Sequence, residues 1–142
     1  MLLLDVNVLL AASRDDHPHH GVARSWLAGI VGGNEQFAVP MGVWWSFLRL
    51  ATNRRVFPTP TPLWEAFAFV DAVTAQPGHV PVQPSSRHLG LLRRRCQAVE
   101  ASGDLLPDAV LATLAEELAA TVVTFDRDFA RLGVPYLVPV AP

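Results

Sequence analysis

The stretch TVVTFDRDFARL, residues 121–132, joins an apolar, β-branched run to acidic residues that follow it directly. Val122 and Val123 are typical of a buried strand, whereas Asp126 and Asp128 carry charges that a sheet interior does not tolerate. An aspartate at this place can begin a helix, because its carboxylate accepts hydrogen bonds from backbone N–H groups of the first turn. That role explains a single acid, but the same pattern recurs elsewhere in the chain.

Two further aspartates border apolar segments in a comparable way. Asp5 ends the apolar run at residues 1–5 and is followed at once by more apolar residues, so a surface position does not explain it. Asp108 stands behind Pro107, which we expect at the first position of an apolar helix, with Asp108 in the first turn. Three acids that are far apart in sequence therefore occupy similar structural positions.

Hydrophobic periodicity predicts strands and helices in alternation. The expected strands are residues 1–5, 36–40, 121–125 and 136–140, with residues 79–84 as a poor, proline-limited strand towards an edge. The expected helices are residues 19–31, 41–52, 62–75, 85–102 and 107–120. This order is typical of an α/β fold with a mainly parallel central sheet flanked by helices. Ligands of such sheets bind outside the carboxyl ends of the strands, where we expect Asp5, Asp108 and Asp126 to converge.

The composition indicates an ordinary globular protein. The chain has 142 residues, 51% of them hydrophobic, which is enough for a single domain spanning residues 1–142 with a real core. The net charge of −2 argues against a generally basic nucleic-acid-binding surface, although all 11 basic residues are arginine. With Cys96 as the one cysteine, no apolar run near the length of a membrane span and no basic leader, we expect a cytoplasmic protein without membrane association.

Converging carboxylates repel one another, so such a cluster is stable only when protons or cations neutralise it. The chain contains no lysine that could do so, and hard oxygen ligands favour Mg²⁺ or Mn²⁺. Either ion lowers the pKa of a bound water and stabilises charge on a leaving oxygen, which is the chemistry of metal-dependent phosphoryl transfer. On this reasoning Asp5→Asn should abolish the chemistry without lowering stability.

Three motifs, in this order, carry a resemblance to a known family. The segments LLLDVNVLL (residues 2–10), FLRLATNRRVF (47–57) and DAVLATLAEELAATVVTFDRDFARL (108–132) resemble those of PIN-domain nucleases, most closely the VapC-type toxins of bacterial toxin–antitoxin pairs. The resemblance extends over nearly the whole chain. It implies a Rossmann-like α/β/α fold, Mg²⁺- or Mn²⁺-dependent cleavage of RNA, homodimerisation and silencing by a small cognate VapB-like antitoxin.

The same resemblance implies roles for individual residues. By position, Asp5, Asp108 and Asp126 match the metal-binding acids of the family, and Asp128 stands beside them as a further catalytic acid or occasional ligand. Asn7 matches a residue that holds the first acid in place by hydrogen bonding.

The chain departs from the family pattern at one position. PIN nucleases usually carry a further acid, most often Glu, in the helix that here reads MGVWWSFLRLATN, residues 41–53, and this segment contains none. Ser46 or Phe47 stands where that acid is expected. We therefore expect a weak or singly occupied metal site. Ser46 could hold a metal-bound water, or its hydroxyl could bond to a backbone carbonyl.

Several other groups have a functional and a structural interpretation. Arg54 and Arg55 are expected to bind the RNA backbone or an acidic antitoxin segment, with an exposed helix face as the alternative. The run DDHPHH, residues 15–20, offers histidines and acids for a transition-metal site, but a solvated loop is the simpler explanation. Trp44 and Trp45 fit a core or a dimer interface better than a base-stacking platform.

Two functions of different classes follow. In the first, the protein is a metal-dependent endoribonuclease and the toxin of a toxin–antitoxin pair. In the second, it is a degenerate PIN domain that acts only by binding antitoxin or RNA, as the missing helix acid suggests. Phosphatase chemistry with an aspartyl nucleophile fits less well, because the residue two positions after Asp5 is Asn7 and not a second acid.

Overall fold

A computed structural model describes residues 1–140 and contains one parallel sheet with the strand order β2-β1-β3-β4. The strands are β1 (Leu2–Leu4), β2 (Phe37–Ala38), β3 (Thr121–Val123) and β4 (Tyr136–Leu137). In the central pair Leu2 lies opposite Thr121 and Leu4 opposite Val123. The mainly parallel α/β sheet expected from the sequence is confirmed.

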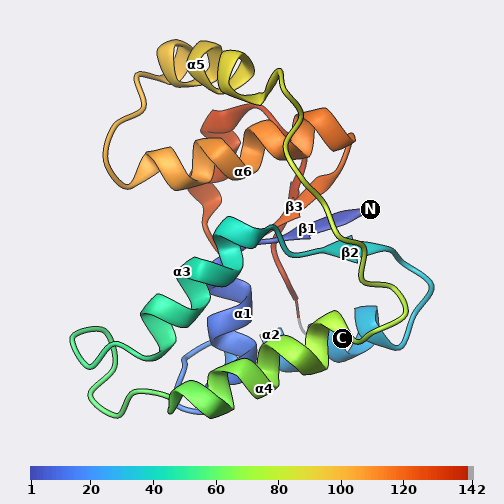
Figure 1. Cartoon of the computed structure of the whole chain (residues 1–142), viewed down its shortest axis with the longest axis vertical. Helices are drawn as coiled ribbons and strands as arrows, with labels where there is room; N and C mark the ends of the chain where they lie inside the picture. The colour runs from blue at the N-terminus through green and yellow to red at the C-terminus, as the bar shows by residue number, and fades with distance from the viewer. Residues whose placement is uncertain (141–142) are drawn as a thin grey trace.

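Helices cover both faces of this sheet (Figure 1). They are α1 (Val6–Ser13), α2 (His20–Val31), α3 (Met41–Ala51), α4 (Leu63–Thr74), α5 (His88–Val99) and α6 (Leu105–Leu118), followed by the 3₁₀ helix η1 (Arg127–Leu132). Figure 1 shows α1 to α4 on one side of the sheet and α5 and α6 on the other. Among residues 1–140, no helix is long and apolar enough to cross a membrane.

Alternation along the strands divides the core into two parts. Leu4 and Val123 point into the cluster formed with α1 to α4, whereas Leu3 and Val122 point into the cluster formed with α6 and η1. Successive strand residues point to opposite faces, so a strand covered on both sides must be apolar throughout. This requirement explains why β1 and β3 contain no charged residue and why the acids begin only where the strands end.

The structure differs from the sequence-based expectation in several elements. Helix α1 was not predicted, because residues 6–12 are almost uniformly apolar and show no helical period. The edge strand expected at residues 79–84 is wrong: His79 forms only an isolated bridge with Phe37, and Pro81 and Pro84 have no N–H group to continue a ladder. Strand β4 ends at Leu137, although we expected it to continue to residue 140.

Helix α6 begins two residues earlier than expected, at Leu105, so Pro107 is at its third position. This is tolerated because none of the first four backbone N–H groups of a helix has an intrahelical partner. Asp108 still lies in the first turn, as expected.

Candidate functional site

Asp5 lies at the junction between β1 and α1 and is only 5% exposed. Its backbone N–H donates to the carbonyl of Val123 at 3.0 Å, which fixes it to the neighbouring strand. Its Oδ1 accepts from the Val6 N–H at 2.6 Å, so the side chain caps α1. Its Oδ2 accepts from Asn7 Nδ2 at 2.8 Å and from Thr124 Oγ1 at 2.7 Å. A carboxylate accepts about four such bonds, so Oδ1 retains one free position for a cation or a water.

Thr124 is fully buried and connects the two strand ends. Its hydroxyl donates to Asp5 Oδ2, accepts from Asn7 Nδ2 at 2.9 Å and accepts from the backbone N–H of Asp126 at 3.0 Å. A hydroxyl has one proton and two lone pairs, so all of its hydrogen-bonding capacity is used. The sequence analysis did not single out this residue, although a polar side chain at the end of an apolar strand was a visible signal.

Asn7 holds the Asp5 carboxylate by donating one of its amide protons to it. The Oδ1 atom of Asn7 accepts from the backbone N–H of Phe125 at 3.1 Å, which fixes the orientation of the amide group. The first turn of α1 and the segment after β3 are thereby connected through side chains, in addition to the pairing of their strands.

Asp126 and Asp128 lie where β3 gives way to η1. Asp126 is the N-cap of η1, and its Oδ1 accepts from the backbone N–H of Asp128 at 2.8 Å. The helix-start role considered from the sequence therefore applies to Asp126, and Asp5 has the same role in α1. For both residues the capping bond occupies part of the carboxylate and leaves other oxygen positions open.

Asp108 enters the same region from the first turn of α6. Burial and the charges of neighbouring acids raise the pKa of its carboxyl to about 7, the acids being, in decreasing order of effect, Asp5, Asp126, Asp128 and Asp104. Burial, and to a smaller extent the Asp126 charge, also raise the pKa of Asp5, against the hydrogen bonds that lower it. The four acids singled out in the sequence therefore lie close enough to interact electrostatically.

In the described part of the chain, one observation argues against a divalent cation beside these acids and another argues for it. Residues 1–140 contain no group of three or more His, Cys, Asp or Glu side chains that could hold a metal ion as they stand. None of the ion pairs within these residues involves Asp5, Asp108, Asp126 or Asp128, so no internal cation balances them. Mg²⁺ needs only one or two carboxylates and keeps several waters, so the donor set fits a largely hydrated ion better than a closed protein cage.

Ser46 and Phe47 of α3 differ in burial, because adjacent residues of a helix face different directions. Phe47 is fully buried, with ring centroids 5.8 Å from Trp44 and 5.2 Å from Phe69, whereas Ser46 is half-buried. Within residues 1–140 the Ser46 hydroxyl makes no hydrogen bond, so the backbone contact considered for it is absent. Trp45, next to it, is 67% exposed and does not belong to the core.

Arg54 and Arg55 are exposed in a turn that follows α3, and not on a helix face. Within the described residues neither forms an ion pair. Their loop is attached to the body by Arg14, which is 7% exposed and was missed in the sequence. Arg14 lies 3.8 Å from the centre of the Phe57 ring and donates to the Thr59 carbonyl at 2.9 Å.

The three histidines of residues 15–20 do not gather around a metal position. His20 Nδ1 lies 2.9 Å from the Ala11 carbonyl and anchors the start of α2. His17 Nδ1 accepts from the backbone N–H of His19 at 3.1 Å. The ring of His19 stacks on Phe125, at a centroid distance of 4.6 Å and an interplanar angle of 13°.

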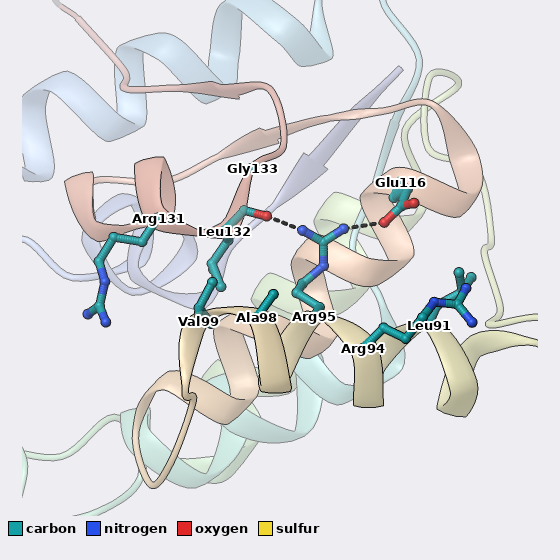
Figure 2. A pocket seen from close by; sticks show the side chains of 9 residues that line it. All are labelled: Leu91, Arg94, Arg95, Ala98, Val99, Glu116, Arg131, Leu132 and Gly133. Atoms are coloured by element: carbon teal, nitrogen blue, oxygen red, sulfur yellow. Dashed lines mark hydrogen bonds and ion pairs between the residues drawn. The ribbon is translucent and has the colours of Figure 1, made fainter.

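A separate pocket of about 360 Å³ lies between α5, α6 and η1 (Figure 2). Figure 2 shows Arg95 in its centre, bonded to Glu116 and to the Leu132 carbonyl, with Arg94 and Arg131 directed away to either side. The pocket contains none of the four acids. Its central arginine is already satisfied, so the pocket is a structural junction between α5, α6 and η1.

Comparisons with known proteins agree with this architecture. The chain is 59% identical to Ribonuclease VapC31 of Mycobacterium tuberculosis over 133 residues, which is 94% of each chain. It is 56% identical to Ribonuclease VapC25 of the same organism over 133 residues, again 94% of each. The fold matches the crystal structure of VapBC2 from Rickettsia felis, bound to a DNA fragment from their promoter, with a TM-score of 0.72, 16% identity and 98% of each chain covered. The family model of the PIN domain matches residues 2–135, and the chain therefore belongs to the PIN-domain family.

Proposed function

We propose that this protein is an endoribonuclease that acts as the toxin of a toxin–antitoxin pair. The observation that carries the proposal is the group of Asp5, Asp108, Asp126 and Asp128 at the carboxyl edge of the sheet, which has no internal counter-ion in residues 1–140. The names of the two relatives, both ribonucleases, support the choice of RNA as the substrate.

The proposed cofactor is Mg²⁺ or Mn²⁺, which Asp5, Asp108 and Asp126 would hold. When bound, such an ion supplies positive charge to the phosphodiester and lowers the pKa of a water. Asp5 accepts hydrogen bonds from Asn7 and Thr124 at its Oδ2 and from the Val6 N–H at its Oδ1, where one position remains. Asp126 is oriented by its bond from the Asp128 N–H, which leaves its Oδ2 without a donor from the described residues.

The protonation of Asp108 should depend on whether a cation is bound among the acids. With a pKa of about 7, its carboxyl is about half protonated at neutral pH while the other acids are unbalanced. A cation among them favours its ionised form, so cation binding and proton release are coupled at this residue. Asp128, whose charge is one cause of the raised pKa, is the proposed fourth catalytic acid.

The absence of an acid in α3 bears on how tightly this site binds its cofactor. With three or four carboxylates and no Glu at position 46 or 47, most ligands of the ion would be waters. We propose that Mn²⁺, with its weaker geometric demands, serves better than Mg²⁺ or that Mg²⁺ acts only at high concentration. Ser46 is the residue of α3 that we propose to support a metal-bound water.

The proposed partners are RNA, a VapB-like antitoxin and a second copy of the chain, all in the cytoplasm. The similar Rickettsia structure is of a VapBC assembly, which supports an antitoxin. Exposed large apolar side chains concentrate on α3 and α4, where Trp45 is 67% and Trp64 is 73% exposed. Large exposed apolar groups favour contacts with other proteins, so this pair of helices supports assembly. Arg54 and Arg55, free of ion pairs in the described part of the chain, are proposed to bind the RNA backbone.

A degenerate PIN domain that binds without cleaving is the second candidate. The lack of an acid in α3 and of a ready three-ligand group in residues 1–140 favours it. Incubation of the purified protein with total RNA, with and without Mg²⁺ or Mn²⁺, separates the two. The nuclease predicts metal-dependent fragments that disappear in Asp108→Asn, whereas a protein that retains RNA but never cuts it is the degenerate domain.

A further inference from the structure

The stack of His19 on Phe125 connects the loop before α2 to the acid site. The two rings are nearly parallel, at 13°, with centroids 4.6 Å apart. Phe125 stands between Thr124 and Asp126 in the chain, and its backbone N–H donates to Asn7. Its backbone is therefore held by Asn7, the residue that also donates a hydrogen bond to Asp5.

The other two histidines of this loop make hydrogen bonds through their rings, whereas the His19 ring makes none within residues 1–140. His20 is anchored to the Ala11 carbonyl, and the Nδ1 atom of His17 accepts from the backbone of His19. The His19 side chain is exposed, and within residues 1–140 neither of its ring nitrogens has a hydrogen-bond partner. The His19 ring stacks on Phe125, and the His17 ring lies beside it, tilted by 43° at a centroid distance of 5.8 Å. An exposed aromatic ring held in this way offers its remaining surface without a further loss of side-chain entropy.

We propose that His19 is a substrate-positioning residue that stacks on a nucleobase adjoining the cleaved phosphodiester. This inference rests on the proposed function, because it takes the acids beside Phe125 as the place where the phosphodiester binds. Unpaired RNA bases stack on aromatic side chains, histidine included, whatever their sequence. A base on His19 extends the Phe125–His19 stack by one ring, beside a segment whose next residue is Asp126.

The site so assigned takes single-stranded RNA in preference to a duplex. Bases in a duplex are already stacked and paired, so engaging His19 would require the target nucleotide to unstack. The same arrangement discriminates little between bases, because every base has a π-face. Any sequence preference then arises elsewhere on the surface.

The test compares His19→Ala with His19→Phe in the full-length protein. Binding of a fluorescent, short single-stranded RNA is followed by anisotropy in EDTA, where metal-dependent cleavage is suppressed. Stacking of one base corresponds to about a fivefold or larger loss of affinity on removal of the ring, which we expect for His19→Ala. His19→Phe retains a flat ring and should bind within about twofold of the wild type. Asp15→Asn, an exposed change in the same loop, serves as the control and should bind as the wild type does.

Two further measurements separate stacking from a merely structural role. In cleavage assays with Mn²⁺, His19→Ala should raise KM much more than it lowers kcat. RNA with one abasic position at the contacted nucleotide should bind more weakly to the wild type, while the same change should have no effect on His19→Ala. A merely structural effect of His19→Ala would leave the penalty of the abasic position intact.

Unchanged RNA binding by His19→Ala, or a loss in His19→Phe as large as that in His19→Ala, would overturn the inference, as would a wild type that binds no RNA. Failure of the proposed function gives a different result. If the wild type binds RNA through His19 but never cleaves it, the proposed nuclease function is wrong and the proposed base contact stands. If the wild type cleaves RNA with no dependence on His19, the nuclease function stands and the base contact is wrong.

Discussion

The hydroxyl of Thr124 donates a 2.7 Å hydrogen bond to Oδ2 of Asp5, although the two residues are 119 positions apart in the chain. The same oxygen of Thr124 accepts from the Asp126 N–H, so one buried hydroxyl sets the relative position of two of the acids. Removal of this group should therefore affect both stability and activity.

Thr124→Val keeps the shape of the side chain and deletes the hydroxyl. It leaves the Asp126 N–H and one proton of Asn7 without their acceptor, so we expect a loss of about 1–3 kcal/mol in the free energy of unfolding, together with a strong loss of RNA cleavage. Urea denaturation and a cleavage assay measure the two effects. Thr113→Val is the matched control, because Thr113 is also fully buried but bonds within α6 and to Arg95. A control that loses as much cleavage as Thr124→Val would contradict a specific role for Thr124.

Asp108 should make the metal-free protein less stable as the pH rises. Its folded-state pKa is about 7 and its ordinary value is 3.8, so between about pH 4 and pH 7 the native state binds more protons than the unfolded state. Stability then falls with rising pH through this window, and the raised pKa of Asp5 acts in the same direction. In EDTA, Asp108→Asn should be more stable than the wild type above pH 7 and should lose this advantage near pH 4.

Urea denaturation of both proteins at several pH values in EDTA measures the difference. Asp71→Asn, an exposed change on α4, accounts for the loss of a single charge. An advantage of Asp108→Asn that does not depend on pH would mean that charge repulsion is not its cause.

Asp5→Asn should destabilise the protein, contrary to the expectation drawn from charge repulsion alone. The carboxylate accepts three hydrogen bonds, and an asparagine amide would direct its own protons at the donors from Asn7 or Thr124. Asn7 cannot simply reverse its amide, because its Oδ1 accepts from Phe125. We expect a loss of about 1–3 kcal/mol at neutral pH, measured by urea denaturation. A variant as stable as the wild type would show that repulsion outweighs these bonds.

A carboxylate introduced in α3 tests the incomplete metal site. Ser46→Glu should tighten Mn²⁺ or Mg²⁺ binding in calorimetry, with Ser46→Gln as the uncharged control of equal size. Phe47→Glu should unfold the protein instead, because it places a charge in the fully buried position between Trp44 and Phe69. If Ser46→Glu leaves metal affinity unchanged while the wild type already binds Mg²⁺ tightly, the site is complete without a residue of α3.

The positions of Asp5 and Asp126 at one edge of the sheet could be predicted from the sequence because parallel strands end at one edge. Asp5 and Asp126 follow strands that must be apolar throughout, so their positions at strand ends could be predicted without knowing which strands pair. The position of Thr124 at a strand end was visible in the sequence, but its role was not. Its role depends on three partners from both ends of the chain, and a threonine at a strand end is common.

Prediction from local sequence also failed for elements whose structure depends on tertiary contacts. Residues 6–12 form a helix because Asp5 caps it and the core cluster between α1 and α4 accepts its apolar side chains, not because of a helical period. The stack of His19 on Phe125 joins residues that no local pattern connects. The bridge of His79 to Phe37 shows the opposite case, in which a strand-like run is stopped by its prolines.

The pairing of β1 with β3 also has a consequence for biosynthesis. Leu2–Leu4 leaves the ribosome long before its partner Thr121–Val123 has been made. At about 5–20 residues per second, roughly ten seconds pass before Asp5 can meet Thr124 and Asp126. A polypeptide that stops before Thr124 therefore lacks the assembled acids, and the proposed cleavage can begin only after this segment has been made.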